Sequence, residues 1–148
     1  MDATPNAGLG TVREWMSRSP ITVSPEHSVE QVIRLMQARG IRHVLVMDGE
    51  RLAGIISNRD VLRLLLGGER LLSPGAPIAQ IMTENPVRVS PDAPLTEAAR
   101  EMLDRRIGAL PVVEGDRPIG ILTKSDAFEA LLAWAEGDLG RVHAGEVG

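Results

Sequence analysis

The chain has 148 residues, of which 43% are hydrophobic and 24% charged, a composition typical of globular proteins that excludes global disorder. Its longest aliphatic run is Leu64-Leu65-Leu66, against the roughly 20 residues of a membrane span, and its N-terminus lacks the pattern of a secretory signal. The absence of cysteine excludes thiolate sites and fits the cytoplasm, while a net charge of −4 and 2% aromatic residues disfavour nucleic-acid binding. We therefore expect a cytoplasmic protein with no nucleic-acid partner and no membrane partner.

The first half of the chain changes its hydrophobic period several times. Apolar residues at i, i+3, i+4 and i+7 from Val29 predict an amphipathic helix, which Ser28 and Gln31 begin as a capping box and Gly40 ends. An Asp-Gly turn between two β-branched runs predicts a hairpin. The expected elements are a strand at 21–23, a helix from Val29, strands at 44–47 and 52–56, and a leucine-rich helix from Asp60 to Gly67-Gly68.

The second half of the chain repeats this order. The expected elements are a strand at 87–89, a helix containing Leu95, Ala98, Ala99 and Met102, strands at 109–113 and 118–122, and a helix from about Ser125 to Ala135. Residues 12–63 align without a gap to residues 78–129 at a constant offset of 66, with 15 identities in 52 positions. Average residue frequencies give about 3 or 4 identities by chance, so the chain contains a true internal repeat.

The repeat predicts an α+β fold of two β-α-β-β-α units. A unit of about 55 residues buries too little surface to be stable alone, so we expect the two to pack face to face about a pseudo-twofold axis. The expected boundaries are a flexible N-terminal tail at 1–11, repeat 1 at 12–66, a linker at 67–77, repeat 2 at 78–136 and a flexible C-terminal tail at 137–148.

A hydroxyl and a carboxylate three residues apart follow a strand in both repeats, as Ser57…Asp60 and Thr123…Asp126. Such a carboxylate can accept two hydrogen bonds from a ribose diol, and the hydroxyl and the N–H groups of a helix start suit a phosphate. The alternative interpretation makes Asp60 and Asp126 the N-cap residues of their helices, with Ser57 and Thr123 only ending the strands. The two roles are compatible with each other.

The repeated motifs resemble those of a tandem pair of cystathionine β-synthase (CBS) domains, a Bateman module of the stand-alone type. The residues that carry the resemblance are Met16, Pro20–Pro25, Gly40–Val46 and Gly54–Asp60 in repeat 1, and Met82, Pro86–Val89, Ile107–Val113 and Gly120–Asp126 in repeat 2. The resemblance implies a ligand such as AMP, ADP, ATP, S-adenosylmethionine or NADH in the cleft between the repeats. It also implies a homodimer and an effector protein that the module regulates.

The resemblance further assigns candidate nucleotide-binding residues. Phosphate contacts fall on Arg42 and His43 in repeat 1, but the matching Gly108 and Ala109 of repeat 2 carry no charge. Arg59 and Lys124 lie near the two expected helix starts, and Ser125 completes the set there. The residues that would line an adenine slot are Ile21, Ile41 and Ile55 in repeat 1 and Val87, Ile107 and Ile121 in repeat 2. The alternatives are that Arg42 is a solvated surface charge and that these aliphatic residues are plain core.

The sequence therefore predicts a non-enzymatic regulatory module that binds an adenosine nucleotide. The alternative is a dimerising or scaffolding module with no nucleotide or with another ligand, which Gly108 and Ala109 favour. An enzyme is disfavoured because no nucleophile elbow is present and the three histidines, His27, His43 and His143, share no metal-ligand spacing. We expect no metal site and no catalytic residue. Apolar helix faces at Leu62, Leu65, Phe128 and Leu131 are expected to be buried between the two subunits of a dimer.

Overall fold

The computed structural model describes residues 8–67 and 73–146. In chain order the elements are α1 Val12–Trp15, β1 Ser17–Arg18, β2 Thr22–Val23, α2 Val29–Arg39, β3 His43–Asp48, β4 Arg51–Ser57, α3 Asn58–Leu65, η1 Ile78–Gln80, β5 Thr83–Glu84, α4 Leu95–Arg105, β6 Ala109–Glu114, β7 Arg117–Thr123 and α5 Lys124–Glu146. The mixed α+β fold class is thus confirmed. In the described part of the chain no helix is long and apolar enough to cross a membrane.

The chain divides into two compact units that do not follow the repeat boundaries. What we call the repeat-1 unit consists of the described residues within 19–87 and 114–119, and the repeat-2 unit of those within 1–18, 88–113 and 120–148. The repeat-1 unit therefore contains the beginning of repeat 2, and the repeat-2 unit contains the beginning of repeat 1. The beginnings of the two repeats are exchanged.

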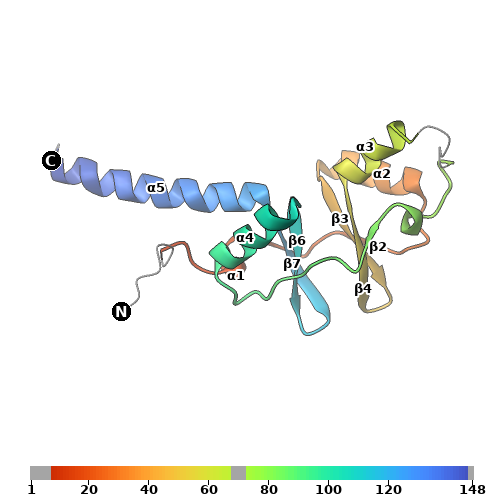
Figure 1. The fold of residues 1–148 in the computed structure, drawn as a ribbon, viewed down its shortest axis with the longest axis horizontal. Coiled ribbons are helices and arrows are strands. Elements are labelled where there is room, and N and C mark those ends of the chain that lie inside the picture. The colour runs from red at the N-terminus through yellow and green to blue at the C-terminus, as the bar shows by residue number, and fades with distance from the viewer. Residues whose placement is uncertain (1–7, 68–72, 147–148) are drawn as a thin grey trace. The chain divides into compact units, whose positions relative to one another are not determined.

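The repeat-1 unit is a four-stranded sheet with helices packed on it, in the strand order β2-β3-β4-β5. Strand β2 runs parallel to β3, and the other neighbours are antiparallel. Figure 1 shows α2 and α3 beside the β3–β4 hairpin. The core residues between helices and sheet are Val23, Val29, Val32, Met36, Val44, Val46, Ile56 and Ile78. The predicted hairpin and its two helices are confirmed.

Helix α2 begins and ends as the sequence predicts. The Ser28 side chain accepts a hydrogen bond from the Gln31 amide, and the Gln31 side chain accepts one from the Ser28 amide, which completes the capping box. Gly40 ends the helix in the left-handed conformation, with a φ of 60°. Two carbonyls of the predicted linker add to the N-terminal cap, since Ala76 O accepts from Val29 N and Pro74 O accepts from Glu30 N. Linker residues 68–72 lie outside the described residues.

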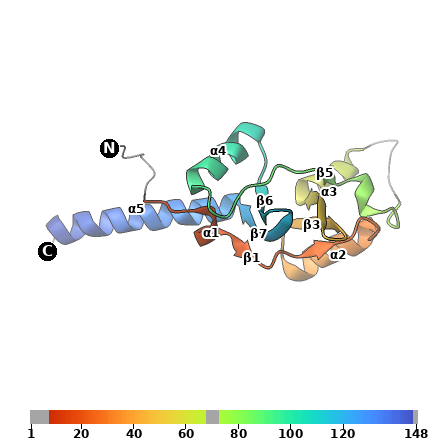
Figure 2. The ribbon, with the colours of Figure 1, turned by 90° about the horizontal axis from the view of Figure 1, so that it is seen from below.

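The repeat-2 unit is built in the same way on a three-stranded sheet of order β1-β7-β6, of which only the hairpin tip at 114–119 is counted with the repeat-1 unit. Helices α1, α4 and α5 contact one another, and Figure 2 shows α1 beside α5. The strand predicted at 87–89 is wrong, because only a single parallel bridge forms, from Val89 to Val112. In repeat 1 the Leu45 amide donates to Ile21 O, but the residue equivalent to Leu45 is Pro111, which has no N–H to donate to Val87.

The exchanged segments contact the two sheets in equivalent ways. Ser17 and Arg18 of β1 pair with Ile121 and Gly120, and Thr83 and Glu84 of β5 pair with Ile55 and Gly54, at the repeat offset of 66 in both partners. No periodic pattern in the sequence predicts these two-residue strands or the short helices α1 and η1. The strands β1 and β5 form only because distant segments of the chain pair in the tertiary structure.

The chain ends differ from the expected flexible tails. Gly10 O accepts a hydrogen bond from Leu95 N, and Thr11 forms a bridge with Pro94, so residues 10 and 11 are tied to the start of α4. The last helix does not end near Ala135 but continues to Glu146. Alanine, leucine and charged residues of good helix propensity outweigh the glycines at 137, 140 and 145, each of which costs about 1 kcal/mol. Residues 1–7, 147 and 148 lie outside the described residues.

Candidate functional site

The first candidate site is the junction between β4 and α3. Asp60 Oδ2 accepts hydrogen bonds from the Ser57 amide at 2.8 Å and from the Ser57 hydroxyl at 2.9 Å, and Ser57 Oγ accepts one from the Asp60 amide at 3.2 Å. The N-cap is therefore Ser57, and Asp60 is the third residue of the helix. The interpretation of Asp60 as the N-cap is wrong, because the strand already places Ser57 in the extended conformation that an N-cap requires.

The second candidate site, between β7 and α5, has the same geometry. Asp126 Oδ2 accepts from the Thr123 amide at 2.8 Å and from the Thr123 hydroxyl at 3.1 Å, and Thr123 Oγ1 accepts from the Asp126 amide at 3.4 Å. Asp126 is therefore not the N-cap either, since α5 begins at Lys124 directly after Thr123. In both junctions one carboxylate oxygen stabilises the helix start and leaves the other for a further contact.

A backbone contact joins each junction to the loop before the neighbouring strand. The amide of Asn58 donates to Arg42 O at 2.9 Å, and the amide of Lys124 donates to Gly108 O at 3.0 Å. The two donors, Asn58 and Lys124, are 66 residues apart, and so are the two acceptors. Arg42 and Gly108 therefore hold equivalent places in the two units. The register also pairs His43 with Ser57 in the repeat-1 unit. Within each unit the structure thus brings together the residues that the resemblance assigned to phosphate contacts.

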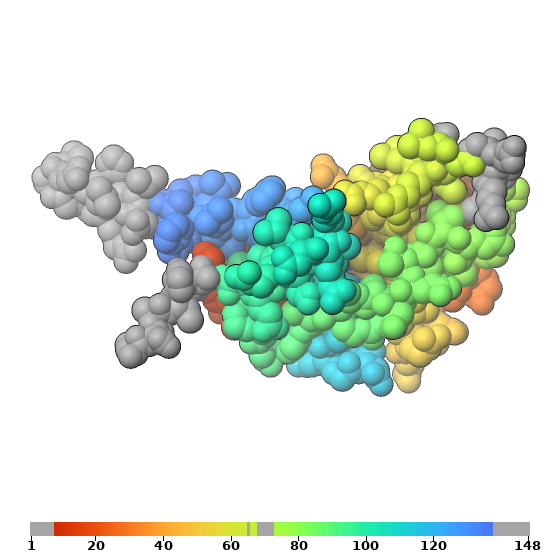
Figure 3. All heavy atoms as spheres, viewed as in Figure 1, coloured from red at the N-terminus to blue at the C-terminus, as the bar shows by residue number. Residues whose placement is uncertain are grey.

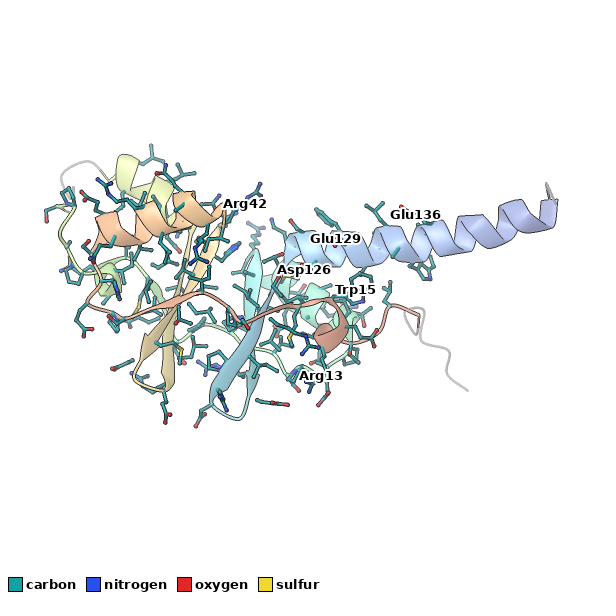
Figure 4. The ribbon with its side chains drawn as sticks, turned by 180° about the vertical axis from the view of Figure 1, so that it is seen from behind. Arg13, Trp15, Arg42, Asp126, Glu129 and Glu136 are labelled. Atoms are coloured by element: carbon teal, nitrogen blue, oxygen red, sulfur yellow. The ribbon has the colours of Figure 1, made fainter. Side chains whose placement is uncertain are left out.

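The side chains at these equivalent places differ in charge. Arg42 is exposed at the start of β3 (Figure 4), and His43 beside it is half-buried. Gly108 is half-buried and Ala109 is buried, so the repeat-2 unit has no cation there. The remaining polar candidates are exposed residues at the two helix starts, namely Arg59, Lys124 and Ser125.

The six candidates for the adenine slot are all half-buried, namely Ile21, Ile41 and Ile55 and their equivalents Val87, Ile107 and Ile121. They differ in this from neighbouring core residues such as Val44 and Ile56, which are fully buried. Ile21 and Ile55 both lie next to Leu45 in the repeat-1 unit, since Ile21 O accepts from Leu45 N and Ile55 pairs with Leu45, and Ile41 belongs to the same unit. Val87 belongs to the repeat-1 unit as well, whereas Ile107 and Ile121 belong to the repeat-2 unit.

One charged residue near the Asp60 carboxylate, Arg63, was not among the predicted site residues. Arg63 Nη1 lies 3.8 Å from Asp60 Oδ1, and the equivalent position in α5 is Glu129. The spacing of three residues from each aspartate was the available signal, since side chains three apart are neighbours on a helix.

Other kinds of site find little support in the structure. No group of three or more His, Asp or Glu side chains in the described ranges can hold a metal ion. An open hollow of about 510 Å³ lies on α2 and α3 and is lined by Val29, Glu30, Ile33, Arg34, Gln37, Leu64 and Pro74. None of the predicted nucleotide-binding residues lines this hollow.

Comparison with known proteins identifies the fold and the motifs together. The sequence model of the CBS domain matches residues 12–67 and again residues 78–133. The chain belongs to the CBS domain family. It is 41% identical over 115 residues to the inosine-5'-monophosphate dehydrogenase of Korarchaeum cryptofilum, which covers 77% of this chain and 23% of the dehydrogenase. The chain spans 23% and 37% of the lengths of two curated relatives that it matches.

Solved structures of CBS domains share this fold. The structure of CBSX2 in complex with AMP is 29% identical, with a TM-score of 0.75, and the match covers 85% of this chain and 98% of that chain. The CBS domain pair of protein MJ0100, in complex with 5'-methylthioadenosine and S-adenosyl-L-methionine, is 26% identical with a TM-score of 0.75, over 83% of this chain and 96% of that chain. The tandem CBS architecture expected from the repeat is confirmed.

Proposed function

We propose that this CBS pair is a non-enzymatic regulatory module that binds an adenosine nucleotide and signals to a partner protein. The observation that carries the proposal is the capping box with a spare carboxylate oxygen, formed once by Ser57 and Asp60 and again by Thr123 and Asp126. Related CBS structures in complex with AMP and with S-adenosyl-L-methionine support an adenosine compound as the ligand.

The proposed chemistry assigns one task to each kind of side chain. The ribose hydroxyls donate hydrogen bonds to a junction carboxylate, for which the chain offers two candidates, Asp60 and Asp126, and charged hydrogen bonds of this kind contribute about 1.5–3 kcal/mol. The exposed guanidinium of Arg42 contacts phosphate, for which its planar fork is suited. The Ser57 and Thr123 hydroxyls donate to the aspartates in the structure, so a contact with phosphate requires each hydroxyl to turn its proton toward the ligand. The half-buried aliphatic residues form the adenine slot.

The second candidate function is a dimerising scaffold whose clefts hold no nucleotide. Gly108 and Ala109 favour it, since they supply no cation where Arg42 and His43 stand in repeat 1. For both functions we propose a homodimer, because large apolar side chains of α3 and α5 are exposed in the single chain. We place the module in the cytoplasm, in keeping with the absence of cysteine.

A thermal-unfolding panel with AMP, ADP, ATP, S-adenosylmethionine and NADH distinguishes the two functions. A ligand present at 100 times its Kd stabilises the folded state by about 2.7 kcal/mol, so a specific ligand raises the unfolding temperature in a concentration-dependent way. Inosine and GMP at the same concentrations are the controls for base recognition. A flat response across all five adenosine compounds would contradict the nucleotide-binding function and favour the scaffold.

A further inference from the structure

The two junction carboxylates, Asp60 and Asp126, have residues of opposite charge three positions further along their helices, Arg63 and Glu129. We propose that Asp126 is the working ribose acceptor and that Asp60 is held by Arg63, so that the chain binds one adenosine-type ligand rather than two. The inference rests on the proposed function and specifies which carboxylate carries it.

The backbone geometry gives no reason for the two sites to differ. Both aspartates accept from the amide and the hydroxyl of the N-cap residue through Oδ2, at distances that agree within 0.2 Å, 2.8 and 2.9 Å for Asp60 and 2.8 and 3.1 Å for Asp126. Both junctions also donate an amide to the loop carbonyl of the neighbouring strand. The difference between the sites therefore comes from the side chains around the second oxygen, Oδ1.

At Asp60 the second oxygen already has a cationic neighbour. Arg63 Nη1 lies 3.8 Å from Asp60 Oδ1, and the Asp60 side chain is only 10% exposed. A ribose diol that approaches Oδ1 competes with this guanidinium for the same oxygen. Arg63 itself is 70% exposed, so the ion pair is weak and can be removed by substitution without loss of the fold.

At Asp126 the equivalent cation is replaced by an anion. Position 129 carries Glu129, which follows Asp126 at the same spacing that separates Arg63 from Asp60, on the early turns of α5 (Figure 4). Among the described residues none forms an ion pair or a hydrogen bond with Asp126 Oδ1. The second oxygen of Asp126 is therefore open to a ribose hydroxyl, which is uncharged and is not repelled by Glu129.

Adenosine and AMP are the probes for calorimetric titration of the full chain. We expect one ligand per chain for the wild type, about 10-fold or weaker affinity for Asp126→Asn, and less than a 2-fold change for Asp60→Asn. Asparagine keeps an oxygen that accepts from the N-cap amide, so both variants retain a helix cap, and their unfolding temperatures check this. Adenosine separates the ribose contact from any effect on phosphate.

A charge exchange tests the role of the i+3 residue. Glu129→Arg should weaken adenosine binding about 3-fold to 10-fold by pairing with Asp126, and Arg63→Glu should add a second binding event per chain. Arg34→Glu, on the exposed side of α2, controls for the change in net charge. Two ligands per wild-type chain, or equal losses for Asp60→Asn and Asp126→Asn, would overturn this inference alone. No binding of either probe would overturn the proposed function, and this inference with it.

Discussion

At Gly54 and Gly120 a neighbouring segment approaches the sheet so closely that no side chain fits. A Cβ at Gly54 of β4 would lie 2.5 Å from Met82 Sδ and 2.9 Å from Thr83 O, and one at Gly120 of β7 would lie 2.7 Å from both Met16 Sδ and Ser17 O. These glycines let the short strands β5 and β1 approach the sheets closely enough to pair. The repeated Gly-Ile motif of the sequence thus has a packing reason in the exchanged segments.

Gly54→Ala should destabilise the fold by about 1–3 kcal/mol, because a methyl group cannot fit against a backbone carbonyl. Urea unfolding measures the change, with Gly75→Ala as the matched control, since a Cβ there meets nothing within 4 Å. Adding Met82→Ala should not restore stability, because the contact with the Thr83 carbonyl remains. A Gly54→Ala variant as stable as the control would show that β5 does not pair with β4.

Helices α2 and α4 are equivalent in the two repeats and end in the same backbone conformation, but at different residue types. Both helices end in the left-handed conformation, at Gly40 with a φ of 60° and at Arg106 with a φ of 56°. Glycine adopts this conformation without strain, whereas other residues are less stable in it by about 1–2 kcal/mol. Repeat 2 therefore contains a strained helix end that repeat 1 avoids.

Gly40→Ala should destabilise the protein by about 1 kcal/mol, and Arg106→Gly should stabilise it by less than about 1 kcal/mol. The gain is smaller because glycine also increases the entropy of the unfolded chain. A Cβ at Gly40 meets no atom within 4 Å, so the loss there reports the backbone conformation and not packing. Chemical unfolding of both variants measures the changes, and opposite signs to these would show that the left-handed ends are absent in solution.

At the scale of the whole molecule the repeat leaves matching apolar faces uncovered. Leu62 of α3 is 56% exposed, and Phe128 and Leu131 of α5 are 64% and 52% exposed. Figure 3 shows α3 and the first part of α5 at the surface. Leu62 and Phe128 are 66 residues apart, so a second copy of the chain offers the same two faces in return. The side chain of Leu65, predicted for the same face, lies outside what the structure describes.

Light scattering of the wild type should therefore give twice the chain mass of 15.9 kDa at micromolar concentration. Leu62→Glu and Phe128→Glu should shift the protein toward the monomer, since each places a charge on a face that the dimer buries. Gln80→Glu, at an exposed position of η1, adds the same single negative charge and is the matched control. A wild-type monomer would contradict the homodimer.

The sequence by itself determined most of the features that depend on local pattern. The Ser28 capping box, the Gly40 helix end and both hairpins follow from side-chain type and spacing within a dozen residues, and the structure confirms them. The repeat offset of 66 follows from aligning the two halves of the sequence. The spacing of Ser57 and Asp60 likewise placed both residues at a strand-to-helix junction, although the alternative interpretation named Asp60 rather than Ser57 as the N-cap.

Only the tertiary structure decided the features that depend on distant partners. The two-residue strands β1 and β5 are too short for any periodic signal, and they exist because each pairs with a sheet strand about 30 or 100 residues away. The missing strand at 87–89 depends on Pro111, a residue without an amide proton on the neighbouring strand. Hydrogen bonds between distant segments form only once the chain has folded, so spacing along the sequence cannot reveal them.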